Sequence, residues 1–311
     1  MLRRGRLVAF PTETVYGLGA DALDAQAVAR IYAVKRRPPT SPLIVHVASV
    51  EMAQALVEVW PEVAGQLAQK FWPGPLTLVL QKRLPRQDAS PAEATIPDIV
   101  TAGLPSVGIR IPAHPLALAL IRAAGVPLAA PSANRFTELS PTTADHVRQS
   151  LGSEVDLILD GGPCVVGIES TVLSLLEPQP TLLRPGGISQ QQLEAVIGPV
   201  ALASQPVEGR PHPAPGMHAR HYSPRTVLYL VEDGKVPHVG RGIYLQYGAA
   251  PRSSTVAVHQ MPQSAPDYAM TLYDVLHRAD ASNYDWIAVD LPPAAPDWEA
   301  IRDRLRRAAA N

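Results

Sequence analysis

The chain has 311 residues, 46% of them hydrophobic, and its 27 lysines and arginines nearly balance 28 aspartates and glutamates. This length suggests two domains, and the near-neutral charge argues against a general nucleic-acid coat protein. Cys164 is the single cysteine, which excludes a disulfide within the chain and a cysteine-cluster metal site, and predicts a reducing, cytoplasmic location. The sequence contains no apolar run long enough for a membrane span, and residues 1–19 do not resemble a signal peptide.

Residues 7–19 are the first stretch with unusual composition. The apolar run at 7–10 predicts a buried strand, and hydroxyl side chains, one carboxylate and two glycines follow it directly. Strand ends followed by small polar residues are where α/β proteins place ligands. From this stretch alone, an ordinary strand and tight turn is an equal alternative, in which Gly17 and Gly19 let the backbone turn closely rather than bind phosphate.

Strand and helix patterns alternate along the rest of the chain. Helices are predicted at 24–35, 52–60, 62–71, 114–124, 142–151, 189–197, 268–279 and 298–310. Strands are predicted at 42–47, 76–80, 106–111, 126–130, 157–159, 167–176, 181–183, 226–231, 242–246, 255–258 and 286–290, with a loop at 83–98. Residues 204–225 contain five prolines and no apolar periodicity, so they predict a linker before a second, smaller α/β domain.

Polar side chains recur near these strands, and cations accompany them. The polar set is Thr12 to Thr14, Ser132 with Asn134, Ser170 with Thr171, and Arg184, and the other cations are Lys35, Arg37 and Arg110. If the strand ends converge, the resulting pocket is cationic and rich in hydroxyl donors, which suits a polyphosphate. The sequence has neither a GxxxxGK[ST] loop nor a GxGxxG motif, so a nucleotide would bind without either phosphate cradle.

Each of these residues also has an ordinary structural explanation. The cations at 35–37 fit a solvated helix end, and Ser132 with Asn134 fits a loop cap. His46 fits a hydrogen-bonded core histidine, and Arg110 fits a structural ion-pair partner. The histidines of the linker lack cysteine partners, which disfavours a metal site; they are His212, His218 and His221. Cys164 is interpreted as a small apolar residue.

Six ordered motifs resemble the YrdC-like family. They are PTETVYGLG at 11–19, KRRP at 35–38, PLIVHV at 42–47, PSAN at 131–134, IESTV at 168–172 and LRPG at 183–186. The signature PGMHARHYSP at 215–224 is similar to the long form of the family, the threonylcarbamoyl-AMP synthases, and the match is weaker from 226 onward. The resemblance implies an α/β fold: a YrdC-like twisted mixed sheet with helices at 1–203, a Pro-rich linker closing over the active site at 204–225, and a Rossmann-like α/β domain at 226–311.

The reaction that the resemblance implies converts L-threonine, bicarbonate and ATP into threonylcarbamoyl-AMP and pyrophosphate, for threonylcarbamoyladenosine modification of tRNAs that read codons beginning with A. Threonine-binding positions carry over to Thr14, His46, Arg110, Ala130 and Ser170. ATP-binding positions carry over to Lys35, Arg37, Ser41, Ser106, Ser132, Asn134, Ser140, Arg184 and Tyr222. Lys35 and Arg37, with Mg²⁺ held largely by the phosphates, would neutralise charge during catalysis, and no metal ligand from the protein is expected. Ser41 departs from the family, which often has Asn there.

Two other functions remain open at this point. One is a module that binds tRNA or double-stranded RNA without synthase activity, which the near-neutral charge disfavours. The other is carbamoyl transfer from carbamoyl phosphate, as in hydrogenase-maturation proteins, whose zinc-finger segments have no CxxC counterpart here. The synthase interpretation implies downstream tRNA-modification transferases as partners, a contact with tRNA and no membrane. Relatives usually carry a helical lead-in before the first strand, so a start upstream of Met1 is one expectation.

Overall fold

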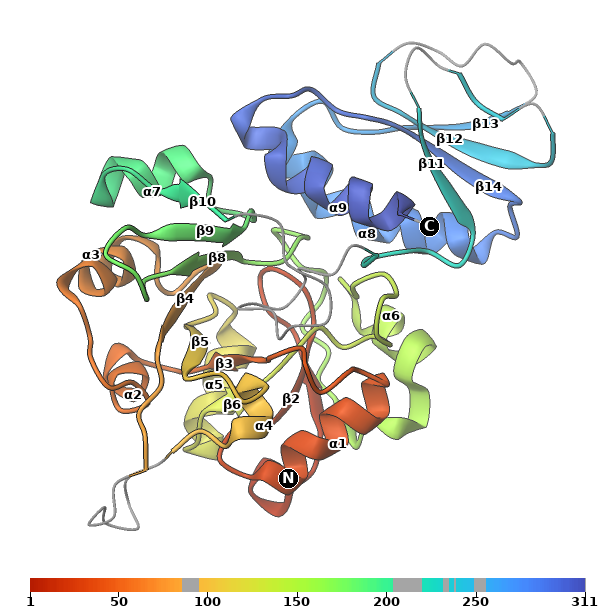
Figure 1. Cartoon of the computed structure of the whole chain (residues 1–311). Coiled ribbons are helices and arrows are strands. Elements are labelled where there is room, and N and C mark those ends of the chain that lie inside the picture. Colours follow the sequence, from red (N-terminus) through yellow and green to blue (C-terminus); the bar gives the residue numbers. More distant parts are fainter. Residues whose placement is uncertain (86–94, 204–219, 232–234, 238, 249–255, 311) are drawn as a thin grey trace.

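The computed structural model describes residues 1–85, 95–203, 220–231, 235–237, 239–248 and 256–310 (Figure 1). Over these residues the chain forms a ten-stranded mixed sheet and a four-stranded sheet, both packed against helices. The predicted class, a mixed α/β sheet followed by a smaller α/β unit, is confirmed. In the same residues, no helix is both long enough and apolar enough to cross a membrane.

The large sheet has the strand order β10-β9-β8-β4-β5-β3-β6-β2-β1-β7. Its strands are β1 (Val8–Phe10), β2 (Gly17–Asp21), β3 (Ile44–His46), β4 (Leu76–Gln81), β5 (Ser106–Arg110), β6 (Leu128–Ala129), β7 (Leu157–Ile158), β8 (Thr171–Ser174), β9 (Thr181–Arg184) and β10 (Ala201–Leu202). Its helices are α1 (Ala25–Lys35), α2 (Val50–Gln54), α3 (Glu62–Phe71), α4 (Asp98–Thr101), α5 (Pro115–Ala124), α6 (Ala144–Leu151) and α7 (Gln190–Ile197), with short 3₁₀ turns η1 (Leu2–Arg4) and η2 (Gly152–Glu154).

Strand β1 is buried on both faces, which explains why it is uniformly apolar in sequence. Val8 and Phe10 face a cluster built on α5, whereas Ala9 faces the larger cluster on the opposite side of the sheet. A strand covered by helices on both faces needs apolar side chains at every position instead of an alternating pattern. Strand β1 is therefore fixed within the core. The residues that directly follow it lie at its carboxyl end, where Thr12 and Thr14 line a pocket.

The two glycines of the first motif lie in strand β2, which corrects the prediction that they form a tight turn. Gly19 pairs with Val8 and Gly17 with Phe10 in an antiparallel ladder. A Cβ atom on Gly19 would lie 2.7 Å from Cε1 of Phe10. Because the Phe10 ring occupies that space, glycine is required here for packing of the strand, and the turn itself is formed by residues 11–16.

Two other predicted elements are shorter than expected. The helix predicted at 52–60 is α2 and ends at Gln54, because Val57 pairs with Lys82 in an isolated bridge and the backbone leaves helical geometry. The strand predicted at 167–176 begins only at Thr171. Gly167 has a φ of 79°, in the left-handed region, which interrupts an extended backbone ahead of the strand.

The C-terminal unit is a parallel sheet in the order β11-β14-β12-β13. Its elements are β11 (Val227–Val231), β12 (Gly242–Gln246), β13 (Ala257–Gln260), α8 (Ala265–Ala281), β14 (Trp286–Asp290), η3 (Pro296–Trp298) and α9 (Glu299–Ala309). Helices α8 and α9 cover the face of this sheet that is turned toward the large sheet (Figure 1). The helices therefore form a layer between the two sheets.

One hydrophobic cluster crosses from the C-terminal unit into the N-terminal part of the chain. It joins side chains of α8 and α9, such as Leu272 and Leu305, to Val15, Ile168 and Tyr222. The two parts of the chain thus share buried apolar surface. The boundaries predicted at residues 203 and 225 stay predictions, and 204–219, with His212 and His218, lie outside the described residues.

Candidate active site

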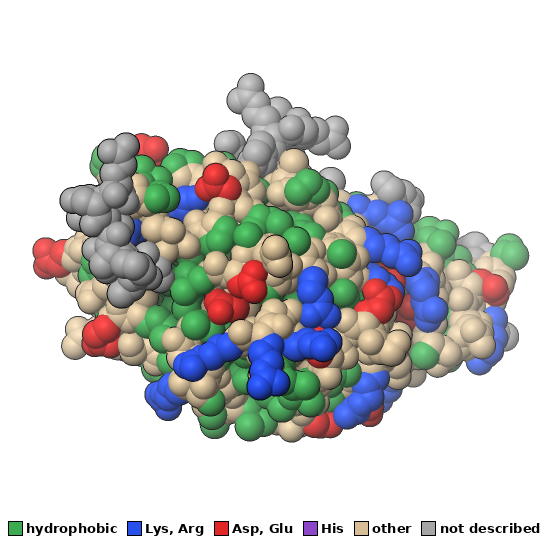
Figure 2. Space-filling model, turned by 90° about the horizontal axis from the view of Figure 1, so that it is seen from below, with side chains coloured by type: hydrophobic (Ala, Val, Ile, Leu, Met, Phe, Trp, Pro, Cys, Tyr) green, Lys and Arg blue, Asp and Glu red, His purple; other side chains and the backbone are tan. Residues whose placement is uncertain are grey.

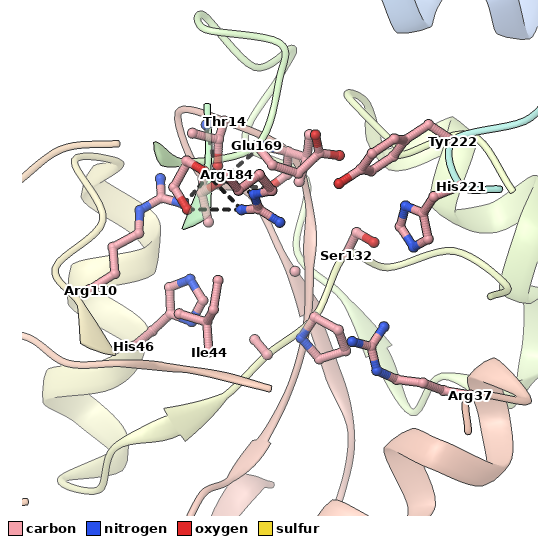
Figure 3. A pocket seen from close by; sticks show the side chains of 16 residues that line it. Thr14, Arg37, Ile44, His46, Arg110, Ser132, Glu169, Arg184, His221 and Tyr222 are labelled. Carbon is pink, nitrogen blue, oxygen red and sulfur yellow. Dashed lines mark hydrogen bonds between the residues drawn. The ribbon is translucent and has the colours of Figure 1, made fainter. Parts of the chain in front are cut away.

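A pocket lies at the carboxyl ends of strands β3 and β5 of the large sheet (Figure 3). Strands β3 and β5 end there side by side, since His46 and Arg110 are partners in their parallel register. The lining residues are Thr12, Thr14, Val15, Gly17, Arg37, Ile44, His46, Arg110, Ala130, Pro131, Ser132, Glu169, Ser170, Arg184, His221 and Tyr222. The predicted convergence of polar and cationic residues on one site is therefore observed for much of the set.

The turn after β1 is held by its own hydroxyl groups. The Oγ1 atom of Thr12 accepts hydrogen bonds from the backbone N–H of Thr14 at 3.1 Å and of Val15 at 3.2 Å. A threonine that bonds to the backbone just after it stabilises a local turn. The turn places the Oγ1 atoms of Thr12 and Thr14 2.8 Å apart, so that the Thr14 hydroxyl is fixed at the pocket wall.

Arg110 has three different partners around its guanidinium group. Nε donates to the carbonyl of Gly74 at 3.1 Å, Nη1 donates to Oγ1 of Thr14 at 2.9 Å, and Nη2 lies 2.6 Å from Oε1 of Glu13. The side chain is buried, so the group is both a structural ion-pair partner and a wall of the pocket. The sequence had left these two interpretations as alternatives, and the structure combines them.

His46 is buried beside this cation. Its Nδ1 atom has no hydrogen-bond partner among the described residues, and its ring meets the ring of Phe10 edge to face at 6.0 Å. Burial, and secondarily the charge of Arg110, lowers the pKa of His46 to about 3. The imidazole is therefore neutral at physiological pH and has an unused nitrogen in a pocket-lining residue, which differs from a fully bonded core histidine.

Two further cations line the same pocket: Arg37 lies on the side opposite Arg110, whereas Arg184 lies next to Thr14 and Glu169 (Figure 3). Arg37 donates through Nε to the carbonyl of Ser41 at 3.2 Å and through Nη2 to the carbonyl of Pro42 at 3.0 Å. Arg184 donates through Nη2 to the carbonyl of Ser170 at 2.9 Å and to its Oγ at 3.2 Å. Burial lowers the pKa of Arg37 to about 10, at which the guanidinium stays charged near neutral pH, and burial also lowers the pKa of Arg184.

Tyr222 forms the wall of the pocket opposite Arg110 (Figure 3). It is 1% exposed, and its hydroxyl has no hydrogen-bond partner among the described residues. Its φ of 61° is unusual for a residue other than glycine, and such strain persists where the surrounding contacts fix it. One of these contacts is His221, whose ring lies edge to face at 4.1 Å. Within the described end of the predicted linker, residues 221–224 are thus buried, and His221 and Tyr222 line the pocket.

Glu169 is a pocket residue to which the sequence analysis assigned no role. Its Oε1 atom accepts from Oγ of Ser140 at 2.5 Å, and its Oε2 atom lies 2.6 Å from Nε of Arg304. Burial alone would raise its pKa, but the charges of Arg304 and Arg184 and the bond from Ser140 leave the pKa below its ordinary value. The carboxylate is consequently ionised and held by donors on several sides.

Five predicted ATP-binding residues do not line the pocket. Nζ of Lys35 donates to the backbone carbonyls of Ser132, at 2.6 Å, and Asn134, while burial and then Arg37 lower its pKa well below the ordinary value. Lys35 thus holds the loop at 131–135, which includes Asn134, through its backbone carbonyls. The carbonyl of Ser41 accepts a hydrogen bond from Arg37. Ser140 is bonded to Glu169, and Ser106 lines a separate small cavity at the other end of β5. Nucleotide contacts by these five residues stay predictions.

Other contributions were missed because they need the tertiary structure. The first motif contains Glu13, but its partner Arg110 comes from a distant segment, and the Pro-rich stretch around His221 does not predict a residue that lines the pocket. A signal for Arg304 was present, because it falls on the apolar face of the last helix, between Ile301 and Leu305. Over the residues that the structure describes, no group of three or more His, Cys, Asp or Glu side chains is arranged to hold a metal ion.

The fold and the site define a two-part α/β protein whose buried, cationic pocket suits an anionic small molecule. The family model described as telomere recombination (Sua5_yciO_yrdC) matches residues 1–186, and the model of the threonylcarbamoyl-AMP synthase C-terminal domain (Sua5_C) matches residues 188–310. The chain belongs to the threonylcarbamoyl-AMP synthase family, in the form that carries this C-terminal domain. The family and the enzyme class predicted from the motifs are confirmed.

Known proteins are similar over essentially the whole chain. A threonylcarbamoyl-AMP synthase of Bacillus subtilis is 42% identical over 327 aligned residues, covering 100% of this chain and 91% of its own length. One from Pyrococcus abyssi is 39% identical over 332 aligned residues, covering 99% of this chain and 92% of its own. The crystal structure of P. abyssi Sua5 complexed with L-threonine superposes with a TM-score of 0.88 at 38% identity, covering 99% of this chain and 92% of that chain.

Proposed function

We propose that this pocket binds L-threonine beside Arg110 and ATP beside Arg37 and Arg184, and joins them with bicarbonate into threonylcarbamoyl-AMP. The observation that carries the proposal is the separation of two buried cations within one pocket: Arg110 lies beside the neutral His46 on one side, and Arg37 lies on the same side as Tyr222 (Figure 3). A small amino acid and a nucleotide need such separate anion-binding places, with their reacting groups meeting between them.

The threonine side of the pocket offers complementary chemistry. The Nη atoms of Arg110 carry N–H groups beyond those used by Thr14 and Glu13, and a guanidinium fork matches a carboxylate. The hydroxyl of threonine would meet the Thr14 hydroxyl or the free Nδ1 of His46. We assign Ser170 and the small side chain of Ala130 to the same subsite, since both line the pocket.

The nucleotide side would act by neutralising and orienting phosphates. Arg37, Arg184, Ser132 and Tyr222 line the pocket directly, and we assign them to ATP. The other five predicted ATP-binding residues do not line the pocket, and we propose that they support the lining residues or reach ATP after a conformational change. They are Lys35, Ser41, Ser106, Asn134 and Ser140. We also retain the proposal that residues 204–225 close over the bound nucleotide and exclude water from the product.

The proposed chemistry has two balanced steps. The threonine amine bonds to the carbon of bicarbonate, and water leaves, which gives a carbamate. A carbamate oxygen then attacks the α-phosphorus of ATP, and the bond from that phosphorus to the β-phosphate oxygen breaks, which releases pyrophosphate. Charge builds up on the phosphate oxygens during the second step, so the fixed cations Arg37 and Arg184 stabilise it. We assign no general base.

Mg²⁺ would enter with ATP. The carboxylates at the site are already engaged, Glu13 by Arg110 and Glu169 by Arg304, and therefore offer no free ligand set for a metal. A hard cation that keeps most of its water and binds phosphate oxygens fits such a pocket. When bound, it supplies additional neutralisation of phosphate charge.

We also propose the interactions that follow from the family's role in tRNA modification: a contact with tRNA, hand-over of the product to downstream transferases, and a cytoplasmic location. Figure 2 shows Lys and Arg side chains gathered on the face below the view of Figure 1. Arg6 and Arg30 come together at Asp156 near the N-terminus. If such a face binds tRNA, affinity measured with unmodified tRNA should fall steeply as salt is raised.

The test of the reaction is pyrophosphate release with ATP, L-threonine and bicarbonate supplied singly and together. Release should need all three. Pyrophosphate release that is independent of threonine would overturn the proposal. Binding of RNA by a chain that releases no pyrophosphate under any of these conditions would support the alternative of an RNA-binding module.

A further inference from the structure

Arg304 is a buried cation that reaches the active-site wall from the C-terminal unit. It lies on α9 among Ile301, Leu305 and Ala308 and is 1% exposed. A guanidinium group in this apolar face is costly to bury unless several acceptors satisfy it. One acceptor is its neighbour Asp303, whose Oδ2 atom lies 2.7 Å from Nη1, and the other acceptors belong to the segments that form the pocket wall.

The contacts of Arg304 converge on three pieces of the pocket wall. Nε lies 2.6 Å from Oε2 of Glu169, which lines the pocket and precedes Ser170. Nη2 donates at 3.0 Å to the carbonyl of Pro185, the neighbour of Arg184. The guanidinium carbon lies 5.1 Å from the ring centroid of Tyr222. One side chain therefore links the two segments that carry Ser170 and Arg184 to the tyrosine opposite Arg110.

A second element of the C-terminal unit supports the same wall. The hydroxyl of Tyr273, on α8, lies 3.1 Å from Oε2 of Glu169. Gly167, two residues before Glu169, has the backbone of Ala269 and Met270 in the space where a Cβ atom would lie. Helix α8 thus packs directly on the backbone that leads into Ser170, and its contacts fix Glu169 from another side than Arg304 does.

We propose that Arg304 is a positioning residue for the nucleotide side of the pocket, so that the C-terminal unit is a structural part of the active site. This proposal rests on the proposed synthase function. Arg304 does not line the pocket itself. It acts by fixing the positions of Glu169, the Pro185 carbonyl and the Tyr222 ring relative to one another. A planar guanidinium serves three such acceptors at fixed angles, whereas an ammonium group or an apolar side chain does not.

Positioning of the pocket wall can be distinguished from simple neutralisation of the Glu169 charge, because Arg304 also contacts Pro185 and Tyr222. If Arg304 only compensates the carboxylate of Glu169, removal of both charges restores a satisfied wall. If it positions the wall, removal of both charges still leaves Pro185 and Tyr222 without their common support. The double variant Arg304→Met with Glu169→Gln therefore distinguishes the two roles, and it also guards against loss of folding from an unpaired buried charge.

The experiment uses the full chain and measures thermal midpoint, binding of a non-hydrolysable ATP analogue, and pyrophosphate release with ATP and threonine varied separately. For Arg304→Lys, Arg304→Met and the double variant we expect kcat/KM for ATP to fall on the order of 100-fold, as for displaced catalytic groups generally, and analogue affinity to fall with it. KM for threonine should change much less. Asp274→Asn is the matched control, because Asp274 contacts His146 across the two units away from the pocket.

A double variant that folds and has wild-type kcat/KM and analogue affinity would overturn the inference, and so would equal losses in Asp274→Asn. Failure of the proposed function is distinguishable, because it would show as the absence of threonine-dependent pyrophosphate release in the unaltered chain. In that case the analogue affinity of the same variants still decides whether Arg304 positions the nucleotide wall.

Discussion

Arg110 and Glu13 form an ion pair inside the candidate active site, with Nη2 2.6 Å from Oε1 and both side chains less than a tenth exposed. Arg110 ends strand β5, and Glu13 belongs to the turn after β1, so the pair joins two segments of the pocket wall. Glu13 is fixed in turn by the backbone N–H of Ala113, 3.0 Å from Oε2. The guanidinium is therefore oriented before any ligand arrives, which lowers the entropic cost of binding a carboxylate.

Arg110→Lys should raise KM for threonine at least about tenfold and leave KM for ATP nearly unchanged. The lysine keeps a cation against Glu13 but loses the fork that a carboxylate needs, and hydrogen bonds to charged groups contribute about 1.5–3 kcal/mol. Steady-state pyrophosphate release gives both constants. Arg122→Ala, at an exposed position of α5, is the control and should change neither. Equal changes in both constants for Arg110→Lys would remove its assignment to threonine.

Tyr222→Phe should separate ligand binding from stability. The hydroxyl of Tyr222 has no partner among the described residues, so its removal should leave the thermal midpoint unchanged or slightly higher. If the hydroxyl bonds to the nucleotide, the same change should weaken binding of an ATP analogue about tenfold. Calorimetry and analogue titration measure the two quantities on one sample. Unchanged analogue affinity would show that the hydroxyl does not contact the nucleotide.

His46 should make folding sensitive to mild acid. Burial lowers its pKa from an ordinary 6.5 to about 3, so between these values the unfolded chain binds a proton here that the folded chain does not. Stability from this residue is complete above about pH 6.5 and falls by up to about 1.4 kcal/mol for each unit below it. Denaturant unfolding of the wild type and His46→Gln gives the free energy of unfolding at each pH between about pH 7 and about pH 5. This free energy should fall less steeply with decreasing pH in the variant. Parallel slopes would contradict this account.

Gly19→Ala should destabilise the fold by about 1–3 kcal/mol, because its Cβ atom would lie 2.7 Å from the Phe10 ring in a packed core. Phe10→Leu combined with Gly19→Ala should recover part of the loss, since it removes the ring atom concerned. Gly65→Ala is the control: it lies within α3, its new Cβ atom would have ordinary contacts, and alanine favours helix. Chemical denaturation measures all three. A loss in Gly65→Ala as large as in Gly19→Ala would contradict the packing argument.

The sequence predicts the helices and the apolar strands well, and it predicts many of the polar residues that meet in the pocket. Helices such as α1 and α5 are predictable because apolar periodicity and caps are local properties. Strand β2 is not, because its sequence GLGAD lacks the β-branched and aromatic residues that mark strands, and its glycines are explained only by the Phe10 ring across the ladder.

Within the site, residue identity is predictable and pairing is not. The motif containing Glu13 and the strand containing Arg110 are separately recognisable, yet their ion pair depends on sheet topology. Periodicity alone places Arg304 on a buried face and so predicts that it needs a partner. It does not tell that the partner is Glu169, because contacts between distant segments are set by how the two units pack.

One hydrophobic cluster determines how the chain unfolds, because it spans both parts of the chain. It contains Val15, Ile168 and Tyr222 together with Leu272 and Leu305. Side chains of one cluster lose their packing together, so melting of the C-terminal helices exposes apolar surface in the first turn of the N-terminal part. Heating should consequently give one cooperative transition in place of two, with the measured and van't Hoff enthalpies in agreement. The two sheets are distinct in architecture, and we expect them to unfold as one thermodynamic unit.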